Sequence, residues 1–293
     1  MKKNILICGL GALGITYAAR LNNIDKFNLK ILVDESRIER YTKNKPVFNE
    51  VVQNFDYILP SAQFDADLII VCTKMQGLDD AISYMKNFVS SKTVIISLIN
   101  GISSEEKIKK AFPEAKVLKS YFIGHSAERV NNSVIQDGVG KIVSEYNAVL
   151  KEVFEQAGIN YEFSDDINYS MWLKYTLNVF SNQTSAILKM SFGELKHNDE
   201  FIKFAKKIIN EVRQIAEKKG VKNLENLERD ALKALDGMCD SGKTSMLQDI
   251  LAKRHTEVDI FAGELNRLGK ELGVETPYNK VLYDLIKIEE ARW

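Results

Sequence analysis

The sequence predicts an N-terminal α/β domain with a doubly wound, mostly parallel sheet, followed by a C-terminal all-α domain. Over the first 165 residues, apolar runs of strand length alternate with segments whose apolar residues recur at helical spacing. This alternation is typical of a parallel sheet covered by helices on both faces. From about Asp166 onward only helical patterns remain. We therefore expect a doubly wound domain over residues 1–165 and a helical domain over residues 166–293, joined by the linker Ser164–Asn168 (SDDIN).

In the first half, short continuous apolar runs predict buried strands, and longer patterned segments predict helices. Helical spacing is found over residues 78–89 and 146–157, and Gly158 is a typical helix stop. The turn-rich stretch QDGVG separates Val134–Ile135 from Lys141–Val143, which predicts a hairpin or a pair of edge strands. The expected strands are Asn4–Cys8, Leu29–Val33, Leu68–Cys72, Thr93–Leu98 and Lys116–Ile123.

The second half shows helical periodicity interrupted by single glycines, and Pro277 stands just before the last helical segment. No strand-like run is left to join the sheet, so we expect these helices to pack on one another. The expected helices are Trp172–Leu188, Asp199–Lys219, Leu224–Leu235, Met246–Arg254, Thr256–Leu272 and Tyr278–Arg292.

The composition excludes several classes of function. The 293 residues are 45% hydrophobic and 27% charged, and 40 basic side chains balance 40 acidic ones. A neutral chain without a dense basic block offers no electrostatic surface for nucleic acid or for a membrane. No apolar stretch reaches the length of a membrane span, about 18 residues, and the N-terminus lacks a signal-peptide cleavage site. We expect a cytoplasmic protein.

The cysteines and histidines predict neither disulfides nor a metal site. An odd number of cysteines without CxxC spacing does not support a disulfide framework or a zinc site. Two of the cysteines lie in expected strands, where they act as small core residues. The histidines are far apart in the sequence. The residues concerned are Cys8, Cys72 and Cys239, and His125, His197 and His255.

The motif GLGALG predicts dinucleotide binding because it follows a strand and opens a helix. Gly9 makes the tight turn, Gly11 lets the backbone approach a pyrophosphate, and Gly14 lets the helix pack on the strand. Asp34 ends the second expected strand, twenty residues after Gly14, where an acid that binds the ribose is expected. The residues expected to contact the cofactor here are Gly9, Leu10, Gly11, Ala12, Leu13 and Gly14.

A second glycine pattern, GMCDSGKT at Gly237–Thr244, fits the phosphate-binding P-loop formally. A P-loop must leave a buried strand, whereas the preceding NLENLERDALKALD is charged and helical in period. We therefore interpret this segment as a connection between two helices.

Two constellations in the helical half carry groups suited to chemistry. Lys174, Asn178 and Asn182 are spaced by four residues and form one polar stripe on a helix, which is either a solvated face or a functional one. Ser245 and Glu257 are twelve residues apart, or about 18 Å along a straight helix. Both can reach one small substrate only if the helix breaks between them.

A new helix can begin at Thr256, because Asp259 three residues later resembles a capping box. Glu257 would then lie in the first turn of that helix. The alternative is an exposed charge that only stabilises the helix dipole.

With these motifs in this order, the chain resembles the ketopantoate reductase family nearly from end to end. The last three motifs together are specific, and they make GKTSMLQD part of a substrate-binding segment. The motifs are GLGALG, Thr73–Lys74, Asn100–Gly101, K-x-x-x-N-x-x-x-N at Lys174–Asn182, SMLQD at Ser245–Asp249 and TEVD at Thr256–Asp259.

The resemblance implies a Rossmann domain, a helical domain and an active site between them. It implies hydride transfer from a reduced nicotinamide to the C2 ketone of 2-dehydropantoate, which gives pantoate. By position, Lys174 would be the general acid, while Asn178 and Asn182 would bind the substrate hydroxyl and help to hold the lysine. Ser245 would receive the substrate carboxylate, and Glu257 would bind the reacting oxygen or the distal hydroxyl.

The resemblance also implies further cofactor contacts. Asn100 would lie where cofactor and substrate meet, Lys74 beside the cofactor, and Glu257 would contact the cofactor as well as the substrate. The chemistry agrees with these residue types, because hydride delivery to a ketone builds negative charge on oxygen, which an ammonium group can neutralise or protonate.

The choice between NADPH and NADH stays open. The family default is NADPH, and many members place an arginine just after the second strand. Here Asp34 and Glu35 stand in that turn, where they would repel a 2′-phosphate and suit the ribose hydroxyls of NADH. Arg37, Arg40 and Lys43 follow closely enough to reach a phosphate.

Two other functions stay open beside the leading one. The first is reduction of another small 2-keto acid on the same scaffold. The second is a regulatory protein that binds a dinucleotide without turnover, which the polar stripe and Glu257 argue against. The apolar faces of the C-terminal helices can form a dimer interface, so a homodimer is one expectation.

Overall fold

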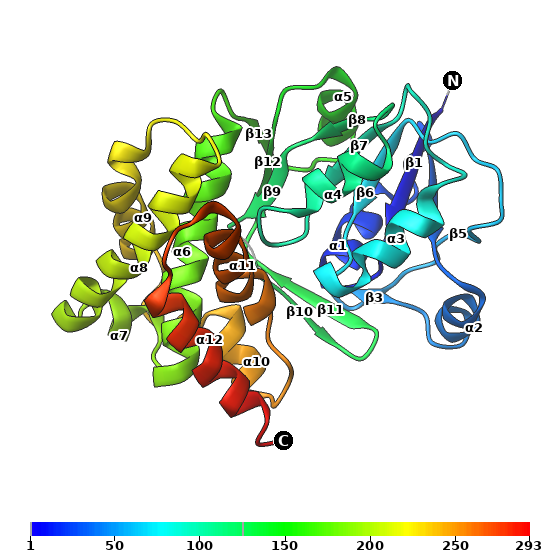
Figure 1. Ribbon diagram of the computed structural model, residues 1–293. Helices are drawn as coiled ribbons and strands as arrows, with labels where there is room; N and C mark the ends of the chain where they lie inside the picture. The colour runs from blue at the N-terminus through cyan, green and yellow to red at the C-terminus, as the bar shows by residue number, and fades with distance from the viewer. Residues whose placement is uncertain (1, 125) are drawn as a thin grey trace. The chain divides into compact units, whose positions relative to one another are not determined.

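The computed structural model describes residues 2–124 and 126–293 (Figure 1). The chain divides into two compact units, Met1–Ile167 and Asn168–Trp293. The first unit is built on a sheet and the second on helices, so the expected fold class is confirmed.

The N-terminal unit contains a six-stranded sheet in the order β5-β2-β1-β6-β7-β8. Every neighbouring pair in it is parallel. The chain runs outward from β1 to β2 and β5, and then returns to β6 on the other side of β1. Such a switch point, at the carboxyl ends of the strands, is where open α/β sheets bind ligands. The strands are β1 Lys3–Cys8, β2 Phe27–Leu32, β5 Tyr57–Ile58, β6 Leu68–Val71, β7 Val94–Ser97 and β8 Lys116–Leu118.

Both faces of this sheet are buried, which explains why its strands read as continuous apolar runs. In β1, Ile5 and Ile7 join one core cluster while Leu6 and Cys8 join the other. Helices α1 and α5 contribute to the first cluster, and α3 and α4 to the second. Cys8 and Cys72 are buried core residues, as expected. The helices are α1 Ala12–Leu21, α2 Glu35–Lys43, α3 Leu78–Met85, α4 Ser104–Ala111 and α5 Ala148–Gln156.

The predicted single strand over Lys116–Ile123 is wrong, because the chain changes sheets at Lys119. Its first part is β8, and its second part, β9 (Ser120–Ile123), pairs with β12 (Lys141–Ser144) in a separate sheet. That sheet has three strands and is completed by β13 (Tyr161–Phe163).

The predicted hairpin between Val134–Ile135 and Lys141–Val143 is also wrong. β11 (Ser133–Asp137) pairs instead with β10 (Ser126–Val130), across a turn in which Asn131 has φ 56°. Gly138 and Gly140 have φ values of 80° and 57°, and this backbone separates β11 from β12. The β10–β11 hairpin belongs to a sheet of order β10-β11-β3-β4, with β3 at Val47–Phe48 and β4 at Val51–Val52.

Residues 168–293, all of which the structure describes, contain helices and connections but no strand. Among all described residues, no helix is long and apolar enough to cross a membrane. The helices of this unit are α6 Ile167–Leu188, α7 Phe192–Lys196, α8 Asp199–Lys218, α9 Leu227–Asp236, α10 Ser245–Leu251, α11 Ala262–Leu272 and α12 Pro277–Glu290, with short 3₁₀ turns η2 at Leu224–Asn226 and η3 at Val258–Ile260.

The expected break between Ser245 and Glu257 is present, since α10 ends at Leu251 and the next helical turn begins at Val258. The helix expected over Thr256–Leu272 is divided, however. Glu257 precedes the single turn η3, and α11 begins only after Phe261, whose φ and ψ are −103° and −94°.

The segment Gly237–Thr244 connects α9 to α10, which confirms that it is a link between helices. It packs on α7, because Phe192 and Gly193 donate backbone hydrogen bonds to Gly242 and Asp240. The match of this segment to the P-loop pattern is therefore coincidental.

Candidate active site

The glycine turn after β1 is shaped by contacts that exclude a side chain at two positions. Gly9 has φ 98°, and a Cβ there would lie 2.8 Å from the Cγ2 atom of Thr73. A Cβ on Gly14 would lie 1.9 Å from the carbonyl oxygen of Gly9. At Gly11 the nearest atom, the carbonyl oxygen of Cys72, would be 3.7 Å away, an ordinary contact. Packing within the chain therefore explains Gly9 and Gly14, whereas the space beside Gly11 is less closely filled.

The first turn of α1 offers unpaired backbone donors beside that space. Gly11 is the N-cap residue and has no side chain to satisfy the amides that follow it. Such a helix start binds phosphate well, because its N–H groups and dipole favour negative charge. In addition, the buried hydroxyl of Thr73 has no hydrogen-bond partner among the described residues. This cradle fits the pyrophosphate of a dinucleotide.

Asp34 follows β2 and caps the start of α2. Its Oδ1 atom accepts hydrogen bonds from the Ser36 hydroxyl (2.6 Å) and the Arg37 amide (2.8 Å), and its Oδ2 atom lies 3.6 Å from Nε of Arg37. The hydrogen bond from the Ser36 hydroxyl is the main cause that lowers the pKa of Asp34. Partial burial raises this pKa, but the amide and the charge of Arg37 also lower it, so the net shift is downward. The carboxylate is therefore held ionised at the carboxyl end of β2.

A cavity of about 500 Å³ opens beside this carboxylate. Its walls come from the start of α2, the loop after β5 and one side chain of α3. Its position at the end of β2 suits the adenosine half of a dinucleotide. The lining residues are Asp34, Glu35, Ser36, Leu59, Pro60, Ser61 and Tyr84.

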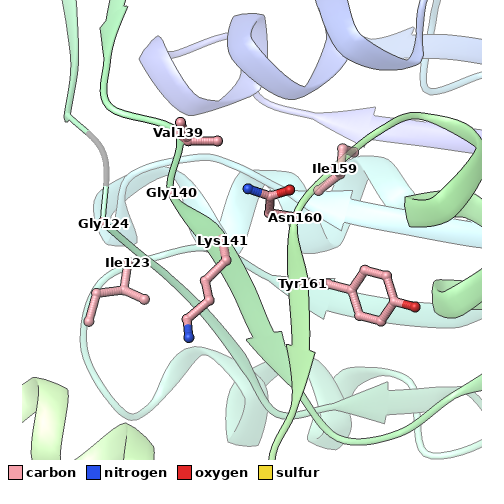
Figure 2. Close-up of a pocket in the computed structure, with 8 residues that line it drawn as sticks. All are labelled: Ile123, Gly124, Val139, Gly140, Lys141, Ile159, Asn160 and Tyr161. Carbon is pink, nitrogen blue, oxygen red and sulfur yellow. The ribbon is translucent and has the colours of Figure 1, made fainter.

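A larger cavity of about 680 Å³ lies where β9, β12 and β13 meet (Figure 2). In Figure 2, the side chains of Lys141 and Tyr161 point in different directions from this sheet. None of the residues expected to bind cofactor or substrate lines it. We therefore do not assign it to the candidate site.

Lys74 and Asn100 both follow strands at the carboxyl edge of the sheet. Lys74 is exposed and precedes a 3₁₀ turn at Met75–Gly77, while Asn100 is partly buried beyond the end of β7. Their placement agrees with the edge at which ligands bind.

The sequence did not single out a buried carboxyl group that follows Asn100 five residues later. Glu105, in the first turn of α4, is 7% exposed, and burial raises its pKa to about 7 despite hydrogen bonds that favour the charged form. The Oγ atom of Ser104 lies 2.9 Å from both Ser97 Oγ and Glu105 Oε2. Ser120 donates to the carbonyl oxygen of Ser97 at 2.7 Å. The group thus ties the ends of β7, α4 and β9 together.

In the helical unit, the polar stripe of α6 is not a solvated face. Asn182 is only 5% exposed, and Lys174 and Asn178 are partly buried. These side chains lie on a helix that is buried along most of its length. Polar groups in such a position need hydrogen-bond partners or a ligand.

Ser245 is the first residue of α10 and is exposed. The preceding residue, Thr244, caps α10 by accepting a hydrogen bond from the Leu247 amide at 3.1 Å. The Thr244 hydroxyl also donates to Ser185 on α6 at 3.1 Å. The start of α10 is therefore anchored to α6 a few residues beyond Asn182.

The turn that carries Glu257 is anchored to α6 at a second point. The hydroxyl of Tyr175 lies 2.9 Å from the carbonyl oxygen of Phe261 and 3.1 Å from that of Ile260. Tyr175 adjoins Lys174 in the chain, and Ile260 ends the turn that follows Glu257. The structure thus brings the elements that carry Lys174, Ser245 and Glu257 together.

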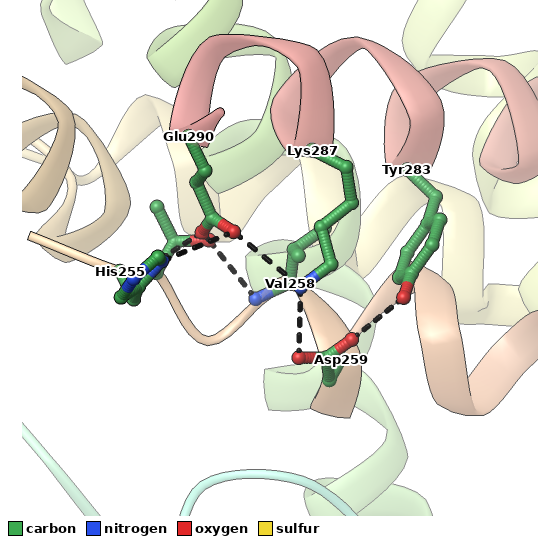
Figure 3. Close-up of polar contacts among 7 residues, drawn as sticks. His255, Val258, Asp259, Tyr283, Lys287 and Glu290 are labelled. Atoms are coloured by element: carbon green, nitrogen blue, oxygen red, sulfur yellow. Dashed lines mark hydrogen bonds and ion pairs between the residues drawn. The ribbon is translucent and has the colours of Figure 1, made fainter. Parts of the chain in front are cut away.

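Helix α12 holds the Glu257 turn from the other side (Figure 3). Glu290 accepts hydrogen bonds from Thr256, and Asp259 accepts from Tyr283 at 2.8 Å and from Lys287 at 3.2 Å. The predicted capping box is not formed here. The Thr256 hydroxyl donates a hydrogen bond to Glu290 and accepts one from the Val258 amide at 3.2 Å.

Among the described residues, no group of three or more His, Cys, Asp or Glu side chains is placed to hold a metal ion. His125 lies outside the described residues.

Known proteins resemble this chain over nearly its whole length. The family model described as "Ketopantoate reductase PanE/ApbA" matches residues 5–147, and the model of its C-terminal part matches residues 166–290. The chain is 28% identical to 2-dehydropantoate 2-reductase of Pyrococcus horikoshii, over 98% of this chain and 97% of that protein. It is 27% identical to the Aquifex aeolicus protein of the same name, over 99% and 98%.

Among solved structures, a complex of D-mandelate dehydrogenase with NADH superposes with a TM-score of 0.86 at 25% identity, covering 100% of this chain and 99% of that one. This chain belongs to the ketopantoate reductase family of NAD(P)H-dependent oxidoreductases, which use a nicotinamide dinucleotide as cofactor.

Proposed function

We propose that this protein is a 2-dehydropantoate 2-reductase, which reduces the C2 ketone of 2-dehydropantoate to the alcohol of pantoate. The observation that carries the proposal is the junction of three elements in the helical unit. Helix α6 with Lys174 and the buried Asn182 is anchored through Tyr175 to the Glu257 turn and through Ser185 to the start of α10. The curated relatives that match nearly the whole chain have this activity by name.

Lys174 is proposed as the proton donor. The reduced nicotinamide, when bound, supplies the hydride that adds to C2. The ketone oxygen then gains negative charge, and the ammonium group of Lys174 stabilises that charge and transfers a proton from Nζ to the oxygen. One hydride and one proton convert the ketone into the alcohol, and Lys174 is left neutral until it is reprotonated by solvent.

The other proposed roles are those of orienting groups. The amides of Asn178 and Asn182 bind the substrate hydroxyl and restrain the lysine. Ser245 donates a hydrogen bond to the substrate carboxylate. Glu257 accepts from a hydroxyl group of substrate or cofactor. Neutral donors and one carboxylate can fix a polar substrate and leave the neutralisation of the negative charge on the C2 ketone oxygen to Lys174.

Cofactor binding is assigned to the N-terminal unit. The backbone of the GLGALG turn receives the pyrophosphate, Asp34 faces the adenosine ribose, and Lys74 and Asn100 contact the cofactor near the carboxyl edge of the sheet.

We propose NADH rather than NADPH as the preferred cofactor. Asp34 is held ionised, and its negative charge would repel a 2′-phosphate. The Nε atom of the nearest arginine, Arg37, lies 3.6 Å from Oδ2 of Asp34. Part of the positive charge of Arg37 is therefore already balanced by this carboxylate. The solved D-mandelate dehydrogenase complex contains NADH, which agrees with this choice.

A second candidate function is reduction of a different 2-keto acid. The likeness to D-mandelate dehydrogenase favours it, because that enzyme acts by name on D-mandelate. Oxidation of the mandelate alcohol would give the aromatic 2-keto acid benzoylformate. Both functions use the same proton donor and differ only in the groups that surround the substrate side chain.

The test measures consumption of NADH and of NADPH by the purified protein with 2-dehydropantoate, benzoylformate and pyruvate. The proposal expects the highest kcat/KM for 2-dehydropantoate. Turnover of benzoylformate but not of 2-dehydropantoate would establish the second function instead. Cofactor binding without turnover of any keto acid would point to a regulatory protein.

A further inference from the structure

An arginine from a distant part of the N-terminal unit reaches the glycine turn. Arg129, on β10, donates a hydrogen bond from one terminal nitrogen to the carbonyl oxygen of Leu10, which lies between Gly9 and Gly11. The two residues are 119 positions apart in the sequence. No property of either segment alone indicates this contact.

The guanidinium group is fixed in place by two further hydrogen bonds. Its Nε atom donates to the carbonyl oxygen of Asn131 at 2.6 Å, and its other terminal nitrogen donates to Oδ1 of Asn132 at 2.9 Å. Both acceptors belong to the turn of the β10–β11 hairpin. The hairpin therefore holds the charge at the glycine turn in a single orientation.

All three acceptors of Arg129 are neutral. They are two backbone carbonyl groups and one side-chain amide, and no carboxylate among the described residues forms an ion pair with this arginine. The side chain is partly buried. A partly desolvated cation without a counter-ion is costly, and an anionic ligand would remove that cost. The guanidinium has five N–H groups, so two remain for such a ligand.

The glycine turn lacks a cation of its own. Between Gly9 and Gly14 there is no charged side chain, and the first turn of α1 contains none. Its backbone N–H groups and helix dipole provide only partial charges for a pyrophosphate that carries two negative charges. Arg129 supplies the full positive charge that the motif does not contain.

We propose that Arg129 binds the pyrophosphate of the dinucleotide cofactor, so that the β10–β11 hairpin completes the phosphate site begun by the GLGALG turn. This inference rests on the dinucleotide cofactor of the family and names a residue that contacts it. It is independent of which keto acid is reduced.

The test compares dissociation constants for NADH, NADPH and ADP-ribose, measured by calorimetry with wild type, Arg129→Gln and Arg129→Lys. Gln keeps an N–H donor close to the position of Nε, which binds Asn131, but removes the charge. All three ligands contain the pyrophosphate, so their dissociation constants should rise together, on the order of 10- to 100-fold, as expected for loss of a charge-assisted hydrogen bond. Lys, which keeps the charge, should recover part of this loss.

Arg20→Gln is the matched control. Arg20, in the last turn of α1, donates to Oε1 of Gln136 on β11 at 3.1 Å and thus ties α1 to the same hairpin at the opposite end of the helix. Its replacement should change the three dissociation constants less than about 2-fold, because surface contacts of this kind contribute little. The thermal unfolding temperature of each variant separates loss of binding from loss of structure.

Three results would overturn the inference. Arg129→Gln can bind all three ligands as tightly as wild type, which shows that the charge is not used. It can weaken NADPH alone, which places Arg129 at the 2′-phosphate. Arg20→Gln can weaken binding of the three ligands as much as Arg129→Gln does, which shows that both arginines act only by holding the hairpin in place. If wild type binds none of these ligands, the cofactor assignment under the proposed function fails as well.

Discussion

Glu290 on α12 accepts two hydrogen bonds from Thr256, one from its backbone N–H and one from its hydroxyl, each at 2.7 Å. The same hydroxyl accepts a hydrogen bond from the backbone amide of Val258 at 3.2 Å. The Glu290 carboxylate, which is 4% exposed, thus holds Thr256 directly, and Thr256 in turn holds Val258 on the other side of Glu257 (Figure 3). The position of Glu257 consequently depends on the end of the last helix.

Glu290→Gln should therefore weaken both the fold and the reaction. The amide keeps one acceptor but loses the charge, and we expect a stability loss of about 1–3 kcal/mol, typical of a hydrogen bond to a charged group. The segment that carries Glu257 should loosen, so that kcat falls by a larger factor than the dissociation constant of the cofactor rises, because the other proposed cofactor contacts lie in the N-terminal unit. Steady-state kinetics and calorimetry test this, with Glu289→Gln, the partly exposed neighbouring residue, as the control.

The same carboxylate should contribute to acid unfolding. Burial alone would raise the pKa of Glu290, but the hydrogen bonds from Thr256 and the charge of Lys287 outweigh it and hold the pKa below its ordinary value. Because the folded pKa is depressed, the stability that Glu290 provides is present above its unfolded pKa of about 4.3 and is lost as pH falls through the folded pKa. Denaturant titrations at falling pH should show a smaller loss for Glu290→Gln than for wild type.

Lys174→Met should remove the proposed proton donor and preserve most of the packing of α6. We expect kcat to fall by a factor of about 10² to 10⁴, the usual contribution of a general acid, with little change in the dissociation constant of the cofactor. Lys189→Met, at an exposed lysine just beyond the end of α6, is the control. A variant of Lys174 with near-normal kcat would exclude it from the acid role.

Asp34→Ser should shift cofactor preference toward NADPH. Serine retains a cap for α2 and removes the charge, so the helix start is preserved. The ratio of kcat/KM for NADPH to that for NADH should rise on the order of 10-fold, as expected for about 1.4 kcal/mol of removed repulsion. An unchanged ratio would show that the ribose is recognised elsewhere, and Asp34→Ala tests how much of any effect comes from loss of the cap.

Glu105 should make the N-terminal unit less stable as pH rises. Its folded pKa of about 7 lies above the ordinary value of 4.5 for a glutamate, because burial disfavours the charge. The stability linked to its proton is therefore complete below the unfolded pKa and is lost as pH rises through about 7. Glu105→Gln should be more stable than wild type near pH 8 by about 3 kcal/mol at most, given the size of the shift.

The control for this prediction is Glu106→Gln, an exposed carboxylate one residue away. Its replacement should leave the pH dependence of unfolding unchanged. Equal pH dependence in wild type and Glu105→Gln would show that Glu105 does not titrate in this range.

Local patterns in the sequence were enough to predict the main sheet and its phosphate turn. β1, β6 and β7 contain continuous buried runs because each strand is covered on both faces, a property that each strand carries by itself. The glycine motif was identifiable because a turn and a helix start are short-range features. The break between Ser245 and Glu257 followed from the rise of a helix together with the requirement that both side chains reach one small substrate.

Pairing between distant segments was decided only by the tertiary structure. β11 pairs with β10 rather than β12, and the strand expected over Lys116–Ile123 is shared between two sheets. The burial of Glu105, the contact of Arg129 with Leu10 and the hold of Glu290 on Thr256 join residues that no local pattern relates. Spacing and periodicity describe the neighbours of a residue along the chain, whereas burial and hydrogen bonding depend on which remote segments pack against it.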